Sequence, residues 1–143
     1  MSIRQVSVFL ENRPGTLAET LQTLTDANVE LRALSIADTT DFGIMRFIAD
    51  DNRKAAFALS EKGHICSVTE VVAACADDRP GGMAAIVKIL AEANINIEYV
   101  YAFVARKQNH AWVVLRVNDA EKAEETLSAA GIPLLTPKDV EEI

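Results

Sequence analysis

Apolar and polar positions change their period along the first half of the chain. Residues 3–10 form a short, mainly apolar run that predicts a strand of about eight residues. Leucines then recur at helical spacing over residues 17–24, which predicts a helix. Pro14 suits the first helical position, and Asn28 tolerates the left-handed conformation that ends helices, so this helix is expected between them.

Three further strands and a second helix follow from the same patterns. The second strand breaks a strict period of two between Leu31 and Leu34, so a bulge or bend is expected there. A polar turn over residues 38–41 leads into the third strand, and Gly63 ends the second helix. The expected elements are strands over 29–37, 42–49 and 65–68 and a helix over 52–62. Their order is β-α-β-β-α-β.

The chain contains an internal repeat. Leu-Glu-Asn-Arg-Pro-Gly-Thr-Leu at residues 10–17 reappears as Ala-Asp-Asp-Arg-Pro-Gly-Gly-Met at residues 76–83, an offset of 66. Ala-Asn-Val-Glu-Leu at 27–31 reappears as Ala-Asn-Ile-Asn-Ile at 93–97. Gly63 matches Gly131 at an offset of 68, so one loop of the second copy is two residues longer. The repeat predicts two modules, residues 1–69 and 70–143.

Each copy is expected to fold as a ferredoxin-like module of the α+β class. A split β-α-β pair with right-handed crossovers gives an antiparallel four-stranded sheet, in the order 4-1-3-2, with both helices on one face. Residues 64–76 are almost continuously strand-like, so the fourth strand of the first copy should run directly into the first strand of the second. Strands two and four are left as edges, which two tandem copies can cover for one another. The elements expected in the second copy are strands near 71–76, 95–104, 111–117 and 134 and helices over 80–93 and 120–130.

Composition narrows the classes of function. The net charge of −7 disfavours nucleic acid, whose phosphates require a basic face. No apolar run approaches the roughly 18–20 residues that cross a bilayer, and the start of the chain lacks a signal-peptide core, so a cytoplasmic protein without a membrane partner is expected. Cys66 and Cys75 do not form a CxxC motif and are interpreted as small buried hydrophobes. His64 and His110 have no partner at ligand spacing, so neither a metal nor a cofactor is expected.

The repeated loop has the chemistry of an anion site. A strand that ends at Arg-Pro-Gly delivers the chain to the positive end of a helix, where free backbone N–H groups are oriented toward an anion such as a carboxylate. Gly15 in the first copy and Gly81-Gly82 in the second let a small ligand approach the backbone closely. Asn12 supplies a donor and an acceptor, whereas Asp78 at the matching place can accept from an ammonium group. A free amino acid carries both charged groups.

Two interpretations of this loop stay open. Asn12 and Asp78 are also ordinary helix N-cap residues, and Pro-Gly is common in turns, so the loop can serve the fold alone. Against this, Glu30 and Asn96 place polar side chains among apolar neighbours at the start of the second strand of each copy, where they can also face a ligand.

The copies differ most on one face of their second strands. The first copy has Ala33 and Ser35 where the second has Tyr99 and Tyr101. This face is either a contact surface for a partner or ligand, or a half-exposed sheet that the tyrosines cover.

Together these motifs resemble the ACT domain family, small regulatory modules that bind amino acids. The resemblance rests on the element order, on Asn-Arg-Pro-Gly-Thr-Leu entering the first helix, and on Ala-Asn-Val-Glu-Leu and Ala-Asn-Ile-Asn-Ile entering the second strands, and it covers both copies. It implies a ligand held between two ACT modules, by the loop of one and the second strand of the other. The ligand-binding residues that it implies are Asn12, Arg13, Pro14, Gly15, Thr16, Leu17, Glu30, Asp78, Arg79, Gly81, Gly82, Met83 and Asn96.

Two positions resemble serine-sensing members such as phosphoglycerate dehydrogenase. Asn12 matches the asparagine before Arg-Pro-Gly that holds their ligand, and Asn96 matches their second asparagine, at the start of strand two. The other copy departs at each position, with Asp78 in place of the first asparagine and Glu30 in place of the second. The histidine that those members place two residues before the first asparagine is Leu10 here. The resemblance therefore implies an amino acid as the ligand class without fixing which one.

The expected function is that of a stand-alone regulatory protein and not of an enzyme. It would bind a free amino acid between ACT modules and transmit this allosterically to a partner or a second chain, with a homodimer and a metabolic enzyme or regulator as expected partners. The alternative is an interaction or dimerisation module that docks on a metabolic enzyme without binding a ligand. Catalysis is disfavoured because the sequence lacks a nucleophile–base pairing, metal-ligand spacing and a Walker-type loop. RNA-recognition modules share the element order, but their Lys/Arg-Gly-Phe pattern and basic surface are missing.

Overall fold

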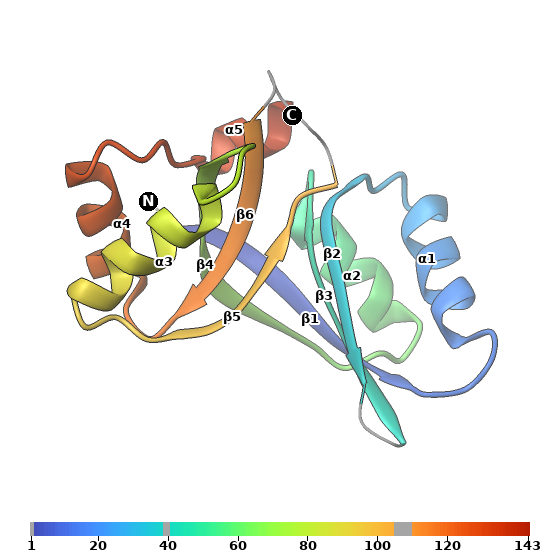
Figure 1. Ribbon diagram of the computed structural model, residues 1–143. Coiled ribbons are helices and arrows are strands. Elements are labelled where there is room, and N and C mark those ends of the chain that lie inside the picture. The colour runs from blue at the N-terminus through green and yellow to red at the C-terminus, as the bar shows by residue number, and fades with distance from the viewer. Residues whose placement is uncertain (1, 39–40, 105–109) are drawn as a thin grey trace. The chain divides into compact units, whose positions relative to one another are not determined.

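The computed structural model describes residues 2–38, 41–104 and 110–143. The contacts divide the chain into an N-terminal unit, Arg4–Thr69, and a C-terminal unit, Glu70–Ile143, to which Ile3 also belongs. Figure 1 shows the strands and helices of each unit. The polar turn expected over residues 38–41 includes residues 39 and 40, which lie outside the described residues.

The N-terminal unit has the predicted order of elements. These are β1 (Ile3–Glu11), α1 (Thr16–Asp26), β2 (Leu31–Asp38), β3 (Phe42–Ala49), α2 (Asn52–Glu61) and the beginning of β4 (Cys66–Asp77). β3 lies between β2 and β1 and is antiparallel to both. β4 lies on the other side of β1, where the Phe9 N–H donates to the Ile65 carbonyl oxygen at 3.4 Å and Gln5 Nε2 donates to Thr69 Oγ1 at 3.1 Å. The predicted strand order 4-1-3-2 is therefore confirmed.

One hydrophobic core joins α1 and α2 to the same face of this sheet (Figure 1). Its strand residues follow the period of two, because every second side chain of a strand points to the helix face. The buried core residues are Val6, Val8, Leu10, Leu24, Met45, Phe47, Ala49, Ala55 and Leu59. Each large side chain among them contributes roughly 1.5–3 kcal/mol by leaving water, so alternating leucine, valine and phenylalanine positions are what hold the two layers together.

The C-terminal unit repeats this architecture. Its elements are the rest of β4, α3 (Gly82–Glu92), β5 (Ile97–Ala102), β6 (His110–Val117), α4 (Ala120–Ala129) and α5 (Pro137–Glu142). β6 pairs antiparallel with both β4 and β5. The strand expected near residue 134 is reduced to a single bridge between Ala74 and Leu134. The core residues are Val72, Ala74, Ala76, Ile86, Leu90, Ile95, Val113, Leu115, Val117, Ala123 and Leu127.

β4 is one uninterrupted strand of 12 residues. The sequence predicts this, because residues 64–76 contain no glycine, proline or polar cluster that would form a turn. The last strand of one copy is thus also the first strand of the next, as expected.

Two irregularities anticipated from the sequence are present. Asn28 follows α1 with a φ of 58°, in the left-handed region, and Asn94 follows α3 with the same value. The pairing of β2 with β3 shifts register between Leu31 and Ala33, which is the expected bulge, and β5 has the same shift after Ile97.

α5 is a helix that the periodicity does not predict. Its six residues are too few to establish a helical repeat of apolar positions, and only Val140 is buried. It is held instead by a capping box, in which Thr136 Oγ1 accepts from the Asp139 N–H and the Asp139 carboxylate accepts from the Thr136 N–H, with Pro137 at the first helical position. Within the described part of the chain, no helix is long and apolar enough to cross a membrane.

Candidate functional site

The repeated loop differs from the prediction at the start of its helix. α1 begins at Thr16 and not at Pro14, because Gly15 takes a left-handed conformation with a φ of 89° and becomes the N-cap residue. Pro14 lies in the turn before it. Gly81, with a φ of 88°, has the same role before α3. The expectation that Pro14 occupies the first helical position is therefore wrong.

The N-capping interpretation of the loop is also wrong. Both N-cap residues are glycines and provide no side-chain cap, so neither Asn12 nor Asp78 occupies the capping position. The Asn12 backbone N–H donates to the Asp41 carbonyl oxygen at 3.0 Å, which fixes the chain as it leaves β1. The identity of the side chains at these two positions is therefore not set by the N-cap of the following helix.

Each of these helices begins with two unpaired backbone donors. Among the described residues, no carbonyl oxygen accepts from the N–H groups of Leu17 and Ala18, or from those of Met83 and Ala84. This is the usual state of a first helical turn that lacks a side-chain cap. The same turn carries the positive end of the helix dipole, so both loops present donors suited to an anion.

The arginines of the two loops fold back onto the preceding strands. Arg13 Nε lies 2.8 Å from Glu11 Oε2, and Arg79 Nη2 lies 3.1 Å from Asp77 Oδ2. The hydrogen bond from Glu11, together with its charge, raises the pKa of the Arg13 guanidinium above its ordinary value. Both pairs are exposed to solvent, so they orient the arginines more than they stabilise the fold.

The strand-start residues are fixed through their backbones. The Glu30 N–H donates to Asp50 Oδ1 at 3.0 Å, and the Asp50 N–H donates back to the Glu30 carbonyl oxygen at 3.0 Å. Asn96 and Asn118 form the same reciprocal pair at 3.0 and 3.2 Å. Glu30 also forms an ion pair at 3.1 Å with Arg32, a buried residue at the bulge of β2. The side chain of Asn96 begins β5 without the charge that Glu30 carries.

Within one unit the loop and the strand start lie at opposite ends of the sheet. Glu11, at the loop, pairs with Phe42, whereas Leu31, at the strand start, pairs with Ala49. These two positions of β3 are seven residues apart, which corresponds to about 23 Å along a strand. β6 separates the matching positions of the C-terminal unit in the same way. The predicted site residues of one unit therefore form two separate groups.

The two loops also differ at the first helical residue. A Cβ atom added to Gly82 would overlap the carbonyl oxygen of Asp77 and lie 2.9 Å from its carbonyl carbon. The N-terminal unit carries Thr16 at this position, with a buried Oγ1 that has no hydrogen-bond partner among the described residues. The loop of the C-terminal unit is thus closed onto its helix, whereas the other loop leaves room for a side chain.

The N-terminal unit has a pocket of about 320 Å³ beside its loop. Arg13 and Thr16, both predicted site residues, line it together with Glu19, Lys62 and His64, which the sequence analysis missed as site residues. The last two come from the turn between α2 and β4, far from the loop in sequence, so no local motif points to them. The signal that could have identified them is the repeat, because the second copy has apolar residues at all three of these missed positions.

The tyrosines that distinguish the second copy contact each other. Tyr99 and Tyr101 lie on the same face of β5, with ring centroids 6.4 Å apart and ring planes inclined by 23°. Both are half-buried. The stacked rings form one continuous aromatic surface where the first copy has only Ala33 and Ser35.

No metal-binding cluster occurs in residues 2–38, 41–104 and 110–143, since no three His, Cys, Asp or Glu side chains there lie close enough together. Cys75 is buried, as interpreted from the sequence, and Cys66 is half-buried, and both are free thiols. Burial raises the pKa of each thiol, so both remain protonated at neutral pH.

Comparison with known proteins gives one family and a set of similar structures. The family model described as an ACT domain pair matches residues 1–143. The structure of protein BT0572 from Bacteroides thetaiotaomicron is 35% identical in sequence, with a TM-score of 0.92 over 100% of this chain and 98% of that one. The search of curated proteins gave no match.

Two more distant structures share the fold. The regulatory subunit of aspartate kinase from Thermus thermophilus, in its ligand-free form, is 20% identical, with a TM-score of 0.66 over 92% of each chain. A structure of aspartokinase alpha and beta subunits is also 20% identical, with a TM-score of 0.59 over 89% of this chain and 92% of that one.

Proposed function

Because this chain belongs to the ACT domain family, as a pair of ACT domains, we propose that it is a regulatory protein that binds a free amino acid between ACT modules. The single observation that carries this proposal is the repeated loop, which presents two unpaired backbone N–H groups at the start of a helix in each unit. The signal passes to a partner or a second chain, and the protein acts as a sensor and not as a catalyst. The similarity to a regulatory subunit of aspartate kinase supports an amino-acid-responsive enzyme as the class of partner.

In this proposal the ligand carboxylate lies on the first helical turn. The N–H groups of Leu17 and Ala18 are available to it, and so are those of Met83 and Ala84 in the other copy. Nothing lies within 4 Å of where a Cβ atom of Gly15 would be, so the backbone there is open to a small molecule. A carboxylate on such a turn makes charge-assisted hydrogen bonds, about twice as strong as neutral ones.

Polar side chains from a second module complete the site. Since loop and strand start are separated within a unit, a ligand on the Asn12 loop needs the strand start of another module, such as the one that carries Asn96. Asn12 and Asn96 then fix the ligand through amide donors and acceptors, as the family resemblance implies. The full proposed set is Asn12, Arg13, Pro14, Gly15, Thr16, Leu17, Glu30, Asp78, Arg79, Gly81, Gly82, Met83 and Asn96.

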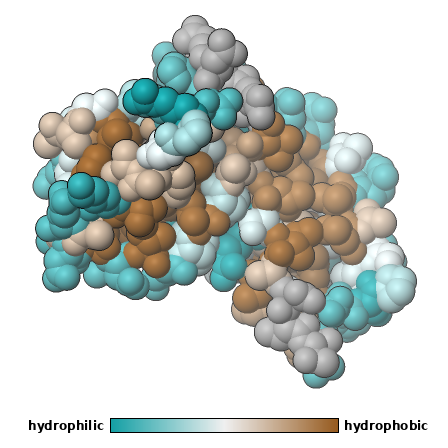
Figure 2. Space-filling model, viewed as in Figure 1, coloured by the Kyte–Doolittle hydropathy of each residue, from teal (hydrophilic) through white to brown (hydrophobic). Residues whose placement is uncertain are grey.

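A second copy of the chain is the proposed source of further modules. β2 is an edge strand whose outer backbone groups are not paired with a strand of the described chain. Apolar side chains gather over β2 and α1 (Figure 2), including the partly exposed Leu17 and Ile36. Unpaired strand edges and clustered apolar side chains are features of surfaces that associate, so we expect a homodimer. Size-exclusion chromatography with light scattering measures this directly.

One observation favours the alternative, an interaction module that binds no ligand. Glu30 is held by the buried Arg32 and presents a negative charge where the serine-sensing pattern has an asparagine. A carboxylate there repels the carboxylate of an approaching amino acid, so the strand start of the N-terminal unit is the less suited of the two.

Thermal denaturation in the presence of each of the twenty amino acids tests the proposal. A ligand at 100 times its Kd stabilises the folded state by about 2.7 kcal/mol, which corresponds to a rise in Tm on the order of 5–10 °C for a chain of this size. Asn12→Ala and Asn96→Ala should abolish the rise and leave the fold intact, whereas the exposed Glu92→Ala should not change it. If no amino acid at millimolar concentration raises Tm, ligand binding is contradicted and the interaction module remains.

A further inference from the structure

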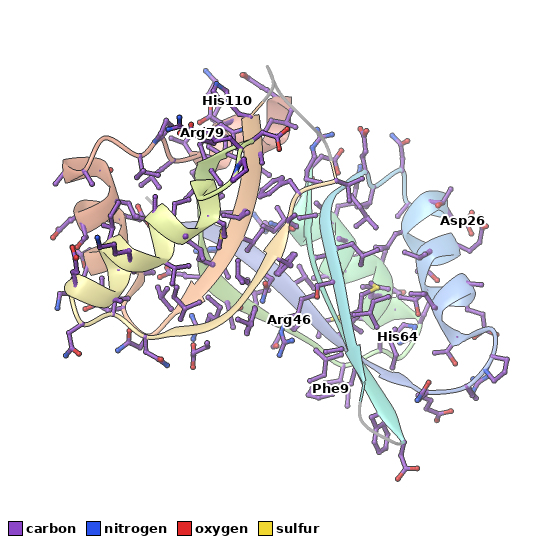
Figure 3. All side chains as sticks on the ribbon, viewed as in Figure 1. Phe9, Asp26, Arg46, His64, Arg79 and His110 are labelled. Atoms are coloured by element: carbon purple, nitrogen blue, oxygen red, sulfur yellow. The ribbon has the colours of Figure 1, made fainter. Side chains whose placement is uncertain are left out.

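The pocket beside the first loop is a cleft built entirely within the N-terminal unit. It lies among the end of β1, the first turns of α1 and the turn between α2 and β4, and has a volume of about 320 Å³. A neighbouring cavity of about 540 Å³ shares Arg13, Glu19, Lys62 and His64 with it and extends along α1 to Asp26. Figure 3 labels His64 and Asp26, with His64 nearer the start of α1 in the view. We call the first of these cavities the α1 cleft.

The repeat provides an internal control for the polar residues of the α1 cleft. Glu19, Lys62 and His64 correspond to Ala85, Ala130 and Ile132 in the C-terminal unit. The backbone confirms this correspondence. The N–H groups of Glu19 and Ala85 each donate to the N-cap glycine of their helix at 3.0 Å, and Lys62 and Ala130 are both helix C-caps. The N–H groups of His64 and Ile132 each donate to the last buried leucine of the preceding helix, at 3.1 and 3.0 Å.

The fold is therefore made equally well with apolar residues at all three positions. Three polar side chains, drawn from two segments more than forty residues apart, converge on one cavity in the copy that keeps them. Packing and chain reversal do not account for them, since the C-terminal unit achieves both without them. A binding role accounts for their convergence.

The charges of the α1 cleft are balanced but separated. Arg13 is engaged by Glu11, as described above. Within the described part of the chain, no hydrogen bond or ion pair engages the side chains of Glu19, Lys62 or His64. One cation, Lys62, and one carboxylate, Glu19, thus face the same cavity without pairing with each other.

The third property of the α1 cleft is an apolar wall. Phe9, Phe42 and Ile65 line it and are 53%, 56% and 72% exposed, respectively, values that are high for such large apolar side chains. Phe9 and Ile65 are adjacent across β1 and β4, joined by the backbone hydrogen bond of 3.4 Å. Covering part of this wall with a ligand removes apolar surface from water, at roughly 25 cal/mol per Å².

We propose that the α1 cleft binds a small zwitterion with an apolar side chain. Lys62 receives the carboxylate, Glu19 receives the ammonium group, and the apolar side chain lies on Phe9, Phe42 and Ile65. His64 adds a donor or acceptor at the mouth. This site goes beyond the one proposed between modules, because it is complete within one unit and uses neither Asn12 nor Asn96.

Three molecules with one carbon skeleton test each charged contact. L-Leucine carries both charges, 4-methylpentanoate lacks the ammonium group, and 3-methylbutylamine lacks the carboxylate. In ¹H–¹⁵N NMR titrations, L-leucine should shift the backbone signals of Glu19, Gly63 and His64, while those of the matching residues in the C-terminal unit serve as the internal reference. Each of the two truncated molecules should bind at least tenfold more weakly. Equal binding of all three molecules, or no binding of L-leucine at 10 mM, overturns the proposal.

The matched variants take their residues from the second copy, which makes them compatible with the fold. Lys62→Ala should weaken L-leucine at least tenfold and remove its advantage over 3-methylbutylamine. Glu19→Ala should remove its advantage over 4-methylpentanoate. An unchanged Tm of the free protein confirms that each variant is folded.

The same titrations separate this proposal from the one above. If Asn12→Ala and Asn96→Ala abolish L-leucine binding while Lys62→Ala and Glu19→Ala leave it unchanged, the α1 cleft is refuted and the site between modules is supported. If the two sets of variants behave in the opposite way, the α1 cleft is supported and the assignment of the asparagines is refuted.

Discussion

Gly82→Ala should be the most damaging single-methyl change in the repeated loops. The added Cβ atom would overlap the Asp77 carbonyl oxygen and lie 2.9 Å from the carbonyl carbon and 3.1 Å from the nitrogen of the same residue. All three atoms belong to the backbone, so no side chain can rotate away to relieve the overlap. The loop between β4 and α3 has to move outward, or the first turn of α3 has to unwind.

The magnitude follows from the nature of the atoms that collide. Inserting one methyl group into packed structure costs typically 1–3 kcal/mol, and a backbone obstacle places Gly82→Ala at the upper end, about 3 kcal/mol. For a cooperative unit of 60–100 residues each kcal/mol lowers Tm by about 4–8 °C. The C-terminal unit should therefore melt on the order of 10–20 °C lower, as followed by far-ultraviolet circular dichroism.

Gly43→Ala is the matched control. Its added Cβ atom would lie 3.6 Å from the nearest atom, the Ala37 carbonyl oxygen, which is ordinary contact. The same chemical change should therefore shift Tm by only a few degrees. If Gly82→Ala melts within about 3 °C of the unaltered protein, the second loop is not closed onto its helix, and the structural difference between the two copies at this residue is refuted.

Three smaller changes test individual features. Thr16→Val removes a buried hydroxyl that has no partner and should leave stability unchanged or raise it by about 1 kcal/mol in urea denaturation; a loss of that size would mean that Oγ1 is hydrogen-bonded. Asp51→Ala removes the side chain that accepts from the Lys54 N–H at 3.0 Å, and should cost about 1 kcal/mol, so an unchanged urea midpoint would contradict this cap. Burial raises the pKa of the Cys75 thiol above its unfolded value, so its contribution to stability is present at neutral pH and is lost as pH rises through the thiol range. Cys75→Ala should flatten the decline in the urea midpoint between pH 8 and 10, and an identical decline in both proteins would refute the assignment.

The elements that could be predicted from sequence are those with a strong local cause. β4 was predictable as one strand because its residues lack any turn signal, and the end of α1 because Asn28 can adopt a positive φ. The start of α1 was not, because proline has the same φ in a turn as at the first helical position. Only the left-handed φ of Gly15, which sequence does not reveal, decides between them.

The candidate site was predictable only in part for a similar reason. The loop chemistry is local and could be read from Arg-Pro-Gly and its neighbours. The α1 cleft depends on residues that meet through the fold, because Lys62 and His64 reach Glu19 only after α2 packs beside α1. Comparing the two copies position by position would have singled out these residues, since polar side chains there replace alanine and isoleucine.

The shared strand β4 constrains how this chain can vary by insertion and deletion. The two-residue difference between the copies falls outside β4, in a part of the second copy where extra length is absorbed by a loop. An insertion of one residue within β4 would instead exchange the two faces of the strand beyond it, turning Val72, Ala74 and Ala76 away from α3 and α4. Only a bulge at the insertion point could restore the original alternation. Length changes at this junction should therefore be rare among functional variants, whereas the loops on either side can lengthen freely.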